Sequence, residues 1–107
     1  MVQNTPASQR TARPPVPRSD SFDPVVANAC GTVLRDWRQQ RALAQDAFAL
    51  LAGIDRSYYG KLERGERQPS LAVLLKCAAA FAQPASALVE AIERQLEHMR
   101  LAVRAQP

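Results

Sequence analysis

A three-residue turn, Gly53-Ile54-Asp55, constrains the fold of this chain more than any other feature. Before the turn, residues 45–52 carry apolar side chains at helical spacing, and Gly53 stands where a helix ends because glycine accepts the left-handed conformation. After the turn, Asp55 is a good N-cap for a second short helix, which we expect over residues 56–64. Two short helices joined by a tight turn that contains glycine form a helix-turn-helix.

The same helical periodicity extends on both sides of this unit. Apolar residues at spacings of three and four predict a first helix over residues 25–41. Pro69-Ser70 opens a fourth helix over 70–82, and a last helix is expected over 85–103. Aromatic residues are only 6 % of the chain and alanine is abundant, which favours helices over sheets. We therefore predict an all-α, compact five-helix bundle.

The apolar faces of these helices predict the core. The inward residues of the first three helices are Val26, Cys30, Val33, Leu34, Trp37, Phe48, Leu51, Ala52, Tyr59 and Leu62. Cys30 and Cys77 have no metal-ligand spacing and are expected as free, buried thiols. With His98 as the single histidine, and without a nucleophile or phosphate-loop signature, we expect no metal, no cofactor, no catalytic residue and no enzymatic activity. No apolar stretch approaches the roughly 20 residues that span a bilayer, so no membrane partner is expected.

The third helix has the features of a DNA-recognition helix. Tyr59 and Leu62 pack inward, so the outward or lateral residues are Arg56, Ser57, Tyr58, Gly60, Lys61 and Arg64. A polar outer face of this kind suits a major groove about 12 Å wide. The net charge of +4 also suits a polyanionic partner.

A longer pattern surrounds the turn. Its elements in chain order are Leu34-Arg35, Arg38, Gln45, Phe48-Ala49, Ala52-Gly53, Asp55, Tyr59, Leu62-Glu63-Arg64-Gly65 and Pro69. In this order the residues resemble the Cro/cI-type (xenobiotic-response-element, XRE) family of phage and bacterial regulators. The resemblance covers about residues 25–90 and implies a lambda repressor-like domain that binds double-stranded DNA. Within this family the chain resembles stand-alone phage repressors and restriction–modification controller proteins.

The resemblance also implies roles for individual residues. It assigns base contacts to Arg56, Ser57, Tyr58 and Lys61, with Tyr58 also suited to a phosphate. It assigns phosphate contacts to Gln45, Arg64, Arg67 and Gln68, with Gln45 also bracing the recognition helix.

Two charged residues near the core stripes receive a structural role from the same resemblance. Arg38 and Glu63 are implied to form an ion pair between the first and third helices, and two solvated surface charges are the alternative. Two positions depart from the family pattern. Ala44 lacks the side-chain cap that Ser or Thr provides, and Ala42 replaces a common glycine, which strains the backbone if φ is positive there.

The last helix is longer than the core requires. Its apolar stripe is Leu88, Ile92, Leu96, Met99 and Val103, of which the first two are also expected to complete the core. We predict a homodimer through this helix and the end of the fourth. A two-fold dimer would present recognition helices about 34–36 Å apart to a palindrome. The alternative is that the C-terminal turns fold back onto their own domain.

Residues 1–24 are polar and contain five prolines. Such a segment buries too little apolar surface to offset its ordering entropy, so we expect a disordered Pro-rich tail. Arg10, Arg13 and Arg18 leave open the alternative of an arm that touches the DNA backbone or minor groove. The expected organisation is this tail, a helix-turn-helix domain over 25–84 and an extended, dimerising helix over 85–107.

The sequence thus predicts a DNA-binding transcriptional regulator, bacterial or phage-encoded, that associates with the nucleoid in the cytoplasm. Two other functions stay open. One is an antitoxin, which would also bind a protein partner. The other is a protein-interaction module of the same fold that does not bind DNA.

Overall fold

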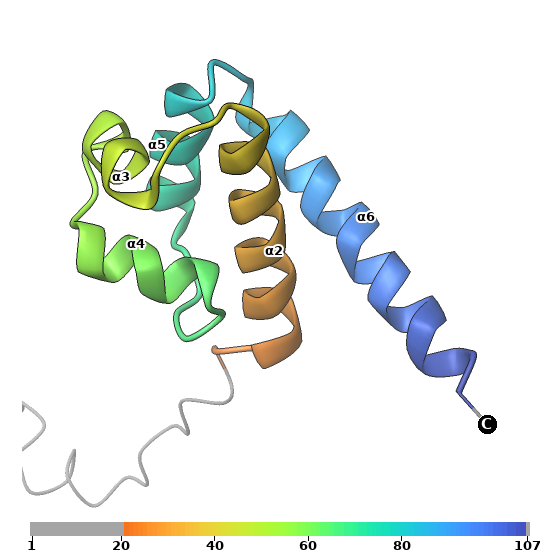
Figure 1. Cartoon of the computed structure of the whole chain (residues 1–107). Coiled ribbons are helices and arrows are strands. Elements are labelled where there is room, and N and C mark those ends of the chain that lie inside the picture. Colours follow the sequence, from red (N-terminus) through yellow and green to blue (C-terminus); the bar gives the residue numbers. More distant parts are fainter. Residues whose placement is uncertain (1–20, 107) are drawn as a thin grey trace, which may run out of the picture.

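The computed structural model describes residues 21–106, which form five helices and no strand (Figure 1). The helices are α2 (Pro24–Gln40), α3 (Gln45–Ala52), α4 (Arg56–Glu63), α5 (Leu71–Ala80) and α6 (Ala85–Arg104). The predicted all-α fold is confirmed, and α3 has the expected bounds. Among the described residues, no single helix is long and apolar enough to cross a membrane. Only α5 and α6 together reach that length and hydropathy, across a bend of 107°.

The first helix begins inside the segment that the sequence predicted to be disordered. The Asp23 carboxylate caps α2 by accepting hydrogen bonds from the backbone N–H groups of Val25 (3.0 Å) and Val26 (3.2 Å). Pro24 suits the first helical position because the N–H it lacks would have no partner there. Residues 21–24 therefore belong to the folded domain, and the rest of that prediction, residues 1–20, lies outside the described residues.

Aromatic rings from α2, α3 and α4, together with Phe81 directly after α5, form the centre of the core. Phe48 stacks on Phe81 with ring centroids 4.3 Å apart and contacts Tyr59 at 5.1 Å. Trp37 meets the Phe81 ring edge-on at 5.3 Å. Leu51 was expected inward but is 62 % exposed. Phe48, Ala49 and Ala52 set the buried face of α3, and Leu51 projects beside that face.

The connections between helices carry the conformations that their residues permit. Gly53 ends α3 with φ +70°, as predicted from its position in the turn. Ala42 and Ala82 also adopt positive φ values, of +55° and +57°. The left-handed conformation costs an alanine roughly 1–2 kcal/mol relative to the right-handed helical conformation, because its Cβ crowds the following carbonyl. Ala44 begins α3 without a side-chain cap.

The long helix α6 packs beside α2, and its C-terminal end extends away from the other helices (Figure 1). Leu88 is fully buried and Ile92 is 6 % exposed, which confirms that both complete the core. The same burial corrects their assignment to a dimer interface, because a side chain enclosed by its own domain has no surface to offer a partner. Leu96 and Met99 are partly buried against the core, and Val103 is 69 % exposed.

Candidate nucleic-acid interface

Helix α4 is held by its N-cap and by its buried side. The Asp55 carboxylate accepts a hydrogen bond from the Tyr58 N–H at 3.0 Å, and Tyr59 and Leu62 are fully buried as predicted. Gly60 was expected outward but is buried. A Cβ there would lie 3.2 Å from the Arg64 guanidinium and 3.6 Å from the Gln45 amide oxygen. Helix α4 therefore presents a narrower outer face than its sequence suggests.

The outer face of α4 carries polar groups at helical spacing. Arg56, Ser57 and Arg64 are exposed, and Lys61 is half-buried. Ser57 and Lys61 are four residues apart, and Lys61 and Arg64 are three apart, so the three side chains share one side of the helix. Tyr58 packs partly against the core. The helix thus offers hydroxyl, ammonium and guanidinium donors along one edge.

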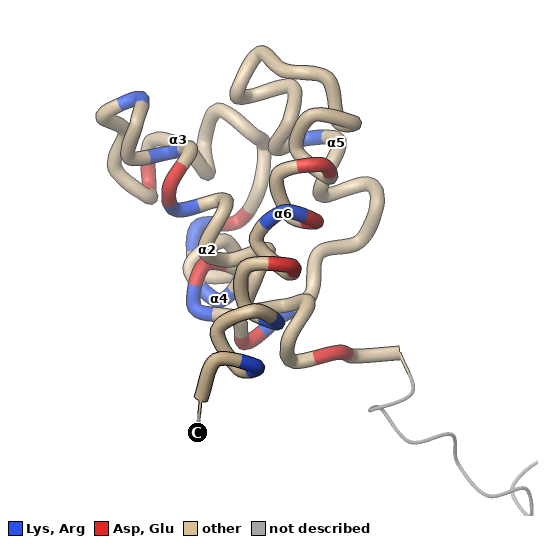
Figure 2. The backbone as a smooth tube through the Cα atoms, turned by 90° about the vertical axis from the view of Figure 1, so that its right-hand side faces the viewer, with Lys and Arg blue, Asp and Glu red and all other residues tan. Residues whose placement is uncertain are grey.

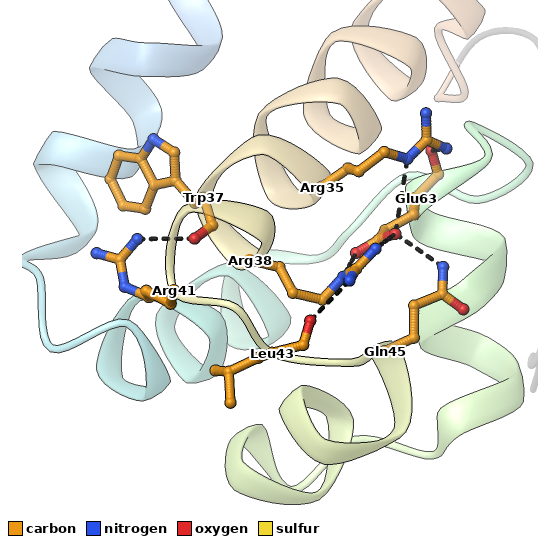
Figure 3. A network of polar contacts seen from close by, with 7 residues as sticks. All are labelled: Arg35, Trp37, Arg38, Arg41, Leu43, Gln45 and Glu63. Atoms are coloured by element: carbon orange, nitrogen blue, oxygen red, sulfur yellow. Dashed lines mark hydrogen bonds and ion pairs between the residues drawn. The ribbon is translucent and has the colours of Figure 1, made fainter.

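A buried carboxylate fixes the end of this helix against α2 and α3 (Figure 3). The Glu63 side chain is 0 % exposed. Arg38 donates to it from Nε at 2.6 Å and from Nη2 at 2.9 Å, which confirms the ion pair that the family resemblance implied. Gln45 Nε2 donates to the same carboxylate at 2.7 Å. Arg38 also donates to the Leu43 carbonyl at 2.8 Å, so one guanidinium joins α2, the α2–α3 link and α4.

The surroundings of Glu63 keep it ionised. Burial opposes its charge, but the hydrogen bonds from Arg38 and Gln45 outweigh burial and lower the pKa of Glu63 below its ordinary value. The hydrogen bond to Glu63 raises the pKa of Arg38. The nearby Tyr59 hydroxyl is buried without a hydrogen-bond partner of standard geometry. Burial first and the neighbouring Glu63 carboxylate second raise the pKa of Tyr59, so its hydroxyl stays protonated beside that carboxylate and helps to lower the pKa of Glu63.

Two residues that support this network had no role in the sequence interpretation. Arg35 donates from Nη2 to the Glu63 backbone carbonyl at 3.2 Å, and its Nε lies 3.8 Å from the carboxylate. Arg35 and Arg38 are three residues apart and therefore lie on one face of α2. This spacing is the sequence signal that could have identified Arg35. Gly31 lets α2 approach α4, because a Cβ there would lie 2.4 Å from the Glu63 carbonyl oxygen.

Exposed acids accompany the basic residues of the outer face. Arg56 pairs with Asp46 of α3 at 3.1 Å, and Arg64 pairs with Glu66 at 2.7 Å. These side chains are about half exposed or more, so solvent screening keeps each ion pair weak and each arginine can exchange its carboxylate for another anion. The guanidinium groups of Arg56 and Arg64 therefore stay at the surface, where they are accessible to a ligand.

The two glutamines that the sequence assigned to phosphate contacts are both engaged within the domain. Gln45 braces Glu63, in keeping with the bracing role expected for it. Gln68 connects the loop after α4 to the start of α2. Its Oε1 accepts from the Asp23 N–H at 2.8 Å, and its Nε2 donates to the Ser21 carbonyl at 3.0 Å. Nothing in the local sequence around Gln68 indicates this long-range tether.

The two short helices, the left-handed glycine between them and the braced second helix define a helix-turn-helix domain. A family model described as HTH_3, helix-turn-helix, matches residues 34–88. The chain belongs to this Cro/cI-type family of DNA-binding transcriptional regulators, which are not enzymes. The expectations for family and protein class are thereby confirmed.

Two of the relatives found are controller proteins. The control protein C.MunI of Mycoplasma sp is 35 % identical over 66 residues, which are 61 % of this chain and 89 % of the relative. The structure of the restriction–modification controller protein C.AhdI from Aeromonas hydrophila is similar at 40 % identity and a TM-score of 0.56. That match covers 58 % of this chain and 94 % of C.AhdI.

A more distant relative supports the fold alone. The clp gene regulator ClgR from Corynebacterium glutamicum superposes with a TM-score of 0.69 at 18 % identity. The match covers 74 % of this chain and 84 % of ClgR.

Proposed function

We propose that this chain is a transcriptional regulator of the controller type. It binds a palindromic site in double-stranded DNA as a homodimer and reads the major groove with α4. The observation that carries this proposal is the outer face of α4, where polar donors project from a helix that the buried Glu63 network holds in one orientation. The similarity to C.AhdI over 94 % of that chain supports the controller type. Such a regulator acts on DNA in the bacterial cytoplasm.

The donors divide by their position on the helix. Arg56, Ser57 and Lys61 contact base edges, and Tyr58 contacts a phosphate or a thymine methyl. An arginine that binds guanine through two hydrogen bonds contributes about 1–3 kcal/mol of discrimination against other bases. Arg64 and Arg67 follow the helix and contact phosphates, which position the domain without reading sequence. Gln45 contributes to the same contacts by holding α4 in place.

Binding to labelled duplexes at several salt concentrations tests these roles. For the wild type, log K should decrease linearly with log salt, by about 0.9 per phosphate neutralised. Arg56→Ala should relax base preference, whereas Arg64→Ala or Arg67→Ala should weaken binding to all duplexes alike and reduce the slope by about 1. Equal losses from every variant would contradict the roles, and salt-independent behaviour would favour a protein-interaction module.

The dimer that we propose uses the outer half of α6. An apolar groove of about 540 Å³ lies between the start of α2 and the end of α6, lined by Val25, Leu96, Met99 and Val103 among others. Val25 is 51 % exposed and Val103 is 69 % exposed. Exposed apolar surface of this kind is typical of a protein partner surface. A second copy of α6 supplies the same apolar stripe, as a two-fold interface requires.

Sedimentation of charged variants tests the interface. Val103→Asp should convert the dimer to a monomer while the domain keeps its helical content, because Val103 is exposed in the monomer. Leu75→Asp is the matched control, since Leu75 is 50 % exposed on α5. If only Leu75→Asp dissociates the dimer, the interface lies on the exposed face of α5 and not on α6. A wild type that sediments as a monomer at the concentrations used for DNA binding would refute the dimer.

A further inference from the structure

The first residue of α4 is paired across the turn with α3. Arg56 begins α4, and its Nη1 donates a hydrogen bond to the Asp46 carboxylate at 3.1 Å. Asp46 is the second residue of α3, so the ion pair joins the starts of the two helices of the helix-turn-helix. Arg56 is one of the residues that we propose contact base edges, and Asp46 therefore lies next to a proposed reading position.

The pair does not belong to the core of the domain. The side chains of Arg56 and Asp46 are 72 % and 68 % exposed, so neither is required for packing. A guanidinium has five N–H donors in one plane, and the contact with Asp46 uses Nη1. Guanine presents two acceptors, O6 and N7, to an arginine that binds it through two hydrogen bonds. Arg56 therefore has enough donors to bind a guanine edge while it stays paired with Asp46.

The carboxylate changes which groups of DNA attract Arg56. An unpaired arginine at the DNA surface binds phosphates, which carry no sequence information. Asp46 offsets the positive charge of Arg56 and repels an approaching phosphate, because both are anions. The acceptors of guanine carry no net charge, so Asp46 repels them far less. The pairing also limits the rotamers of Arg56, and less side-chain freedom is then lost on binding.

The arginine at the other end of α4 is paired in a different way. Arg64 donates from Nε to the Glu66 carboxylate at 2.7 Å, and the two residues are only two positions apart. This pair is local, whereas Asp46 reaches Arg56 from another helix. We have assigned Arg64 to a phosphate contact. Loss of the Glu66 charge should therefore strengthen binding to every duplex without a change in base preference.

We propose that Asp46 is a positioning residue that sets base specificity through Arg56. Its carboxylate holds the guanidinium toward a guanine edge and keeps it from phosphates. The inference rests on the proposed base reading by α4 and adds to it a residue of α3. Asp46 acts without touching a base, so its effect should vanish when Arg56 is absent.

The test uses full-length Asp46→Asn, which keeps the size of the side chain but removes its charge. Base preference is measured by selection from randomised duplexes. Affinity is measured by fluorescence anisotropy on the selected duplex and on a mixed-sequence duplex of equal length. Asp46→Asn should lose preference at the pair of positions that Arg56→Ala also affects, and it should bind the mixed-sequence duplex more tightly. The ratio of the two affinities should decrease about tenfold, which is within the range that an arginine–guanine contact contributes.

Three further variants separate the position of the charge from its presence. Asp46→Glu keeps the carboxylate and should keep the wild-type preference. Glu66→Gln removes an acid from the same proposed DNA-binding face and should strengthen binding to both duplexes alike. Glu90 is as exposed as Asp46, at 68 %, and pairs with Arg94 on α6, where acidic and basic positions are interspersed (Figure 2). Glu90→Gln should change neither base preference nor the affinity ratio.

A double variant tests whether the effect passes through the arginine. In an Arg56→Ala background, Asp46→Asn should cause no further change in base preference. An unchanged or sharper preference in Asp46→Asn alone would overturn the inference, and so would a further loss in the double variant. These results leave the proposed function standing when the wild type enriches a motif. If the wild type enriches none, the proposed function fails together with the positioning role of Asp46.

Discussion

Removing Arg38 tests how much the buried pair holds the recognition helix in place. Arg38→Met leaves the fully buried Glu63 carboxylate with one hydrogen bond from Gln45 and a more distant Arg35 at 3.8 Å. An unpaired buried charge of this kind destabilises a domain by about 3–5 kcal/mol. The loss is a large part of the 5–15 kcal/mol that is typical of the stability of small domains. The variant should therefore fold, but unfold at much lower urea concentration.

The double variant Arg38→Met/Glu63→Met separates charge burial from packing. Neither buried charge remains, so its free energy of unfolding should lie within about 2 kcal/mol of the wild type; the remaining loss reflects the unpaired Leu43 carbonyl and Gln45 amide. Urea unfolding followed by far-ultraviolet circular dichroism gives all the free energies of the cycle, with Glu63→Met as the other single variant. Additive losses, or a loss below about 1 kcal/mol for Arg38→Met, would refute the reasoning.

Further predictions concern the same domain. Gly31→Ala should destabilise it by at least about 2 kcal/mol, because the added Cβ meets backbone oxygen atoms at 2.4 and 2.6 Å; a melting temperature unchanged from the wild type would contradict this. Ala42→Gly and Ala44→Ser should each stabilise it by about 1 kcal/mol in urea unfolding, whereas the control Ala72→Gly, at an exposed position in the first turn of α5, should destabilise it. The pKa of Glu63 is lowered in the fold, so its contribution is complete above pH 4.5 and is lost as the pH falls through the folded-state value. Urea unfolding from neutral to acidic pH should show this loss in the wild type but not in Glu63→Gln, and parallel profiles would count against the assignment.

The sequence predicted those parts of the fold that depend on local signals. Helical periodicity located the five helices of residues 21–106, and turn chemistry located Gly53 and the Asp55 cap. The inward direction of Tyr59 and Leu62 followed from their spacing and is confirmed. The pairing of Arg38 with Glu63 followed from the family resemblance, because their separation of 25 residues has no local signature.

What the sequence missed depends on contacts between distant segments. The requirement for glycine at position 31 arises only where α2 meets the end of α4. Arg41 donates to the Trp37 and Phe81 carbonyls, and its guanidinium lies 4.8 Å from the centroid of the Phe81 ring. The contacts with Phe81 require that the residues that end α2 and α5 already lie close together. The Gln68 tether is likewise visible only once the fold brings the loop after α4 beside the start of α2.

Selection from randomised DNA duplexes, carried out with the wild type and with Arg56→Ala, tests most directly whether the outer face of α4 reads base sequence. The wild type should enrich one palindromic motif. Arg56→Ala should lose its preference at one symmetric pair of positions in that motif while the other positions remain selected. Enrichment of no motif by the wild type, or an unchanged motif with Arg56→Ala, would contradict the assignment of base recognition to this helix.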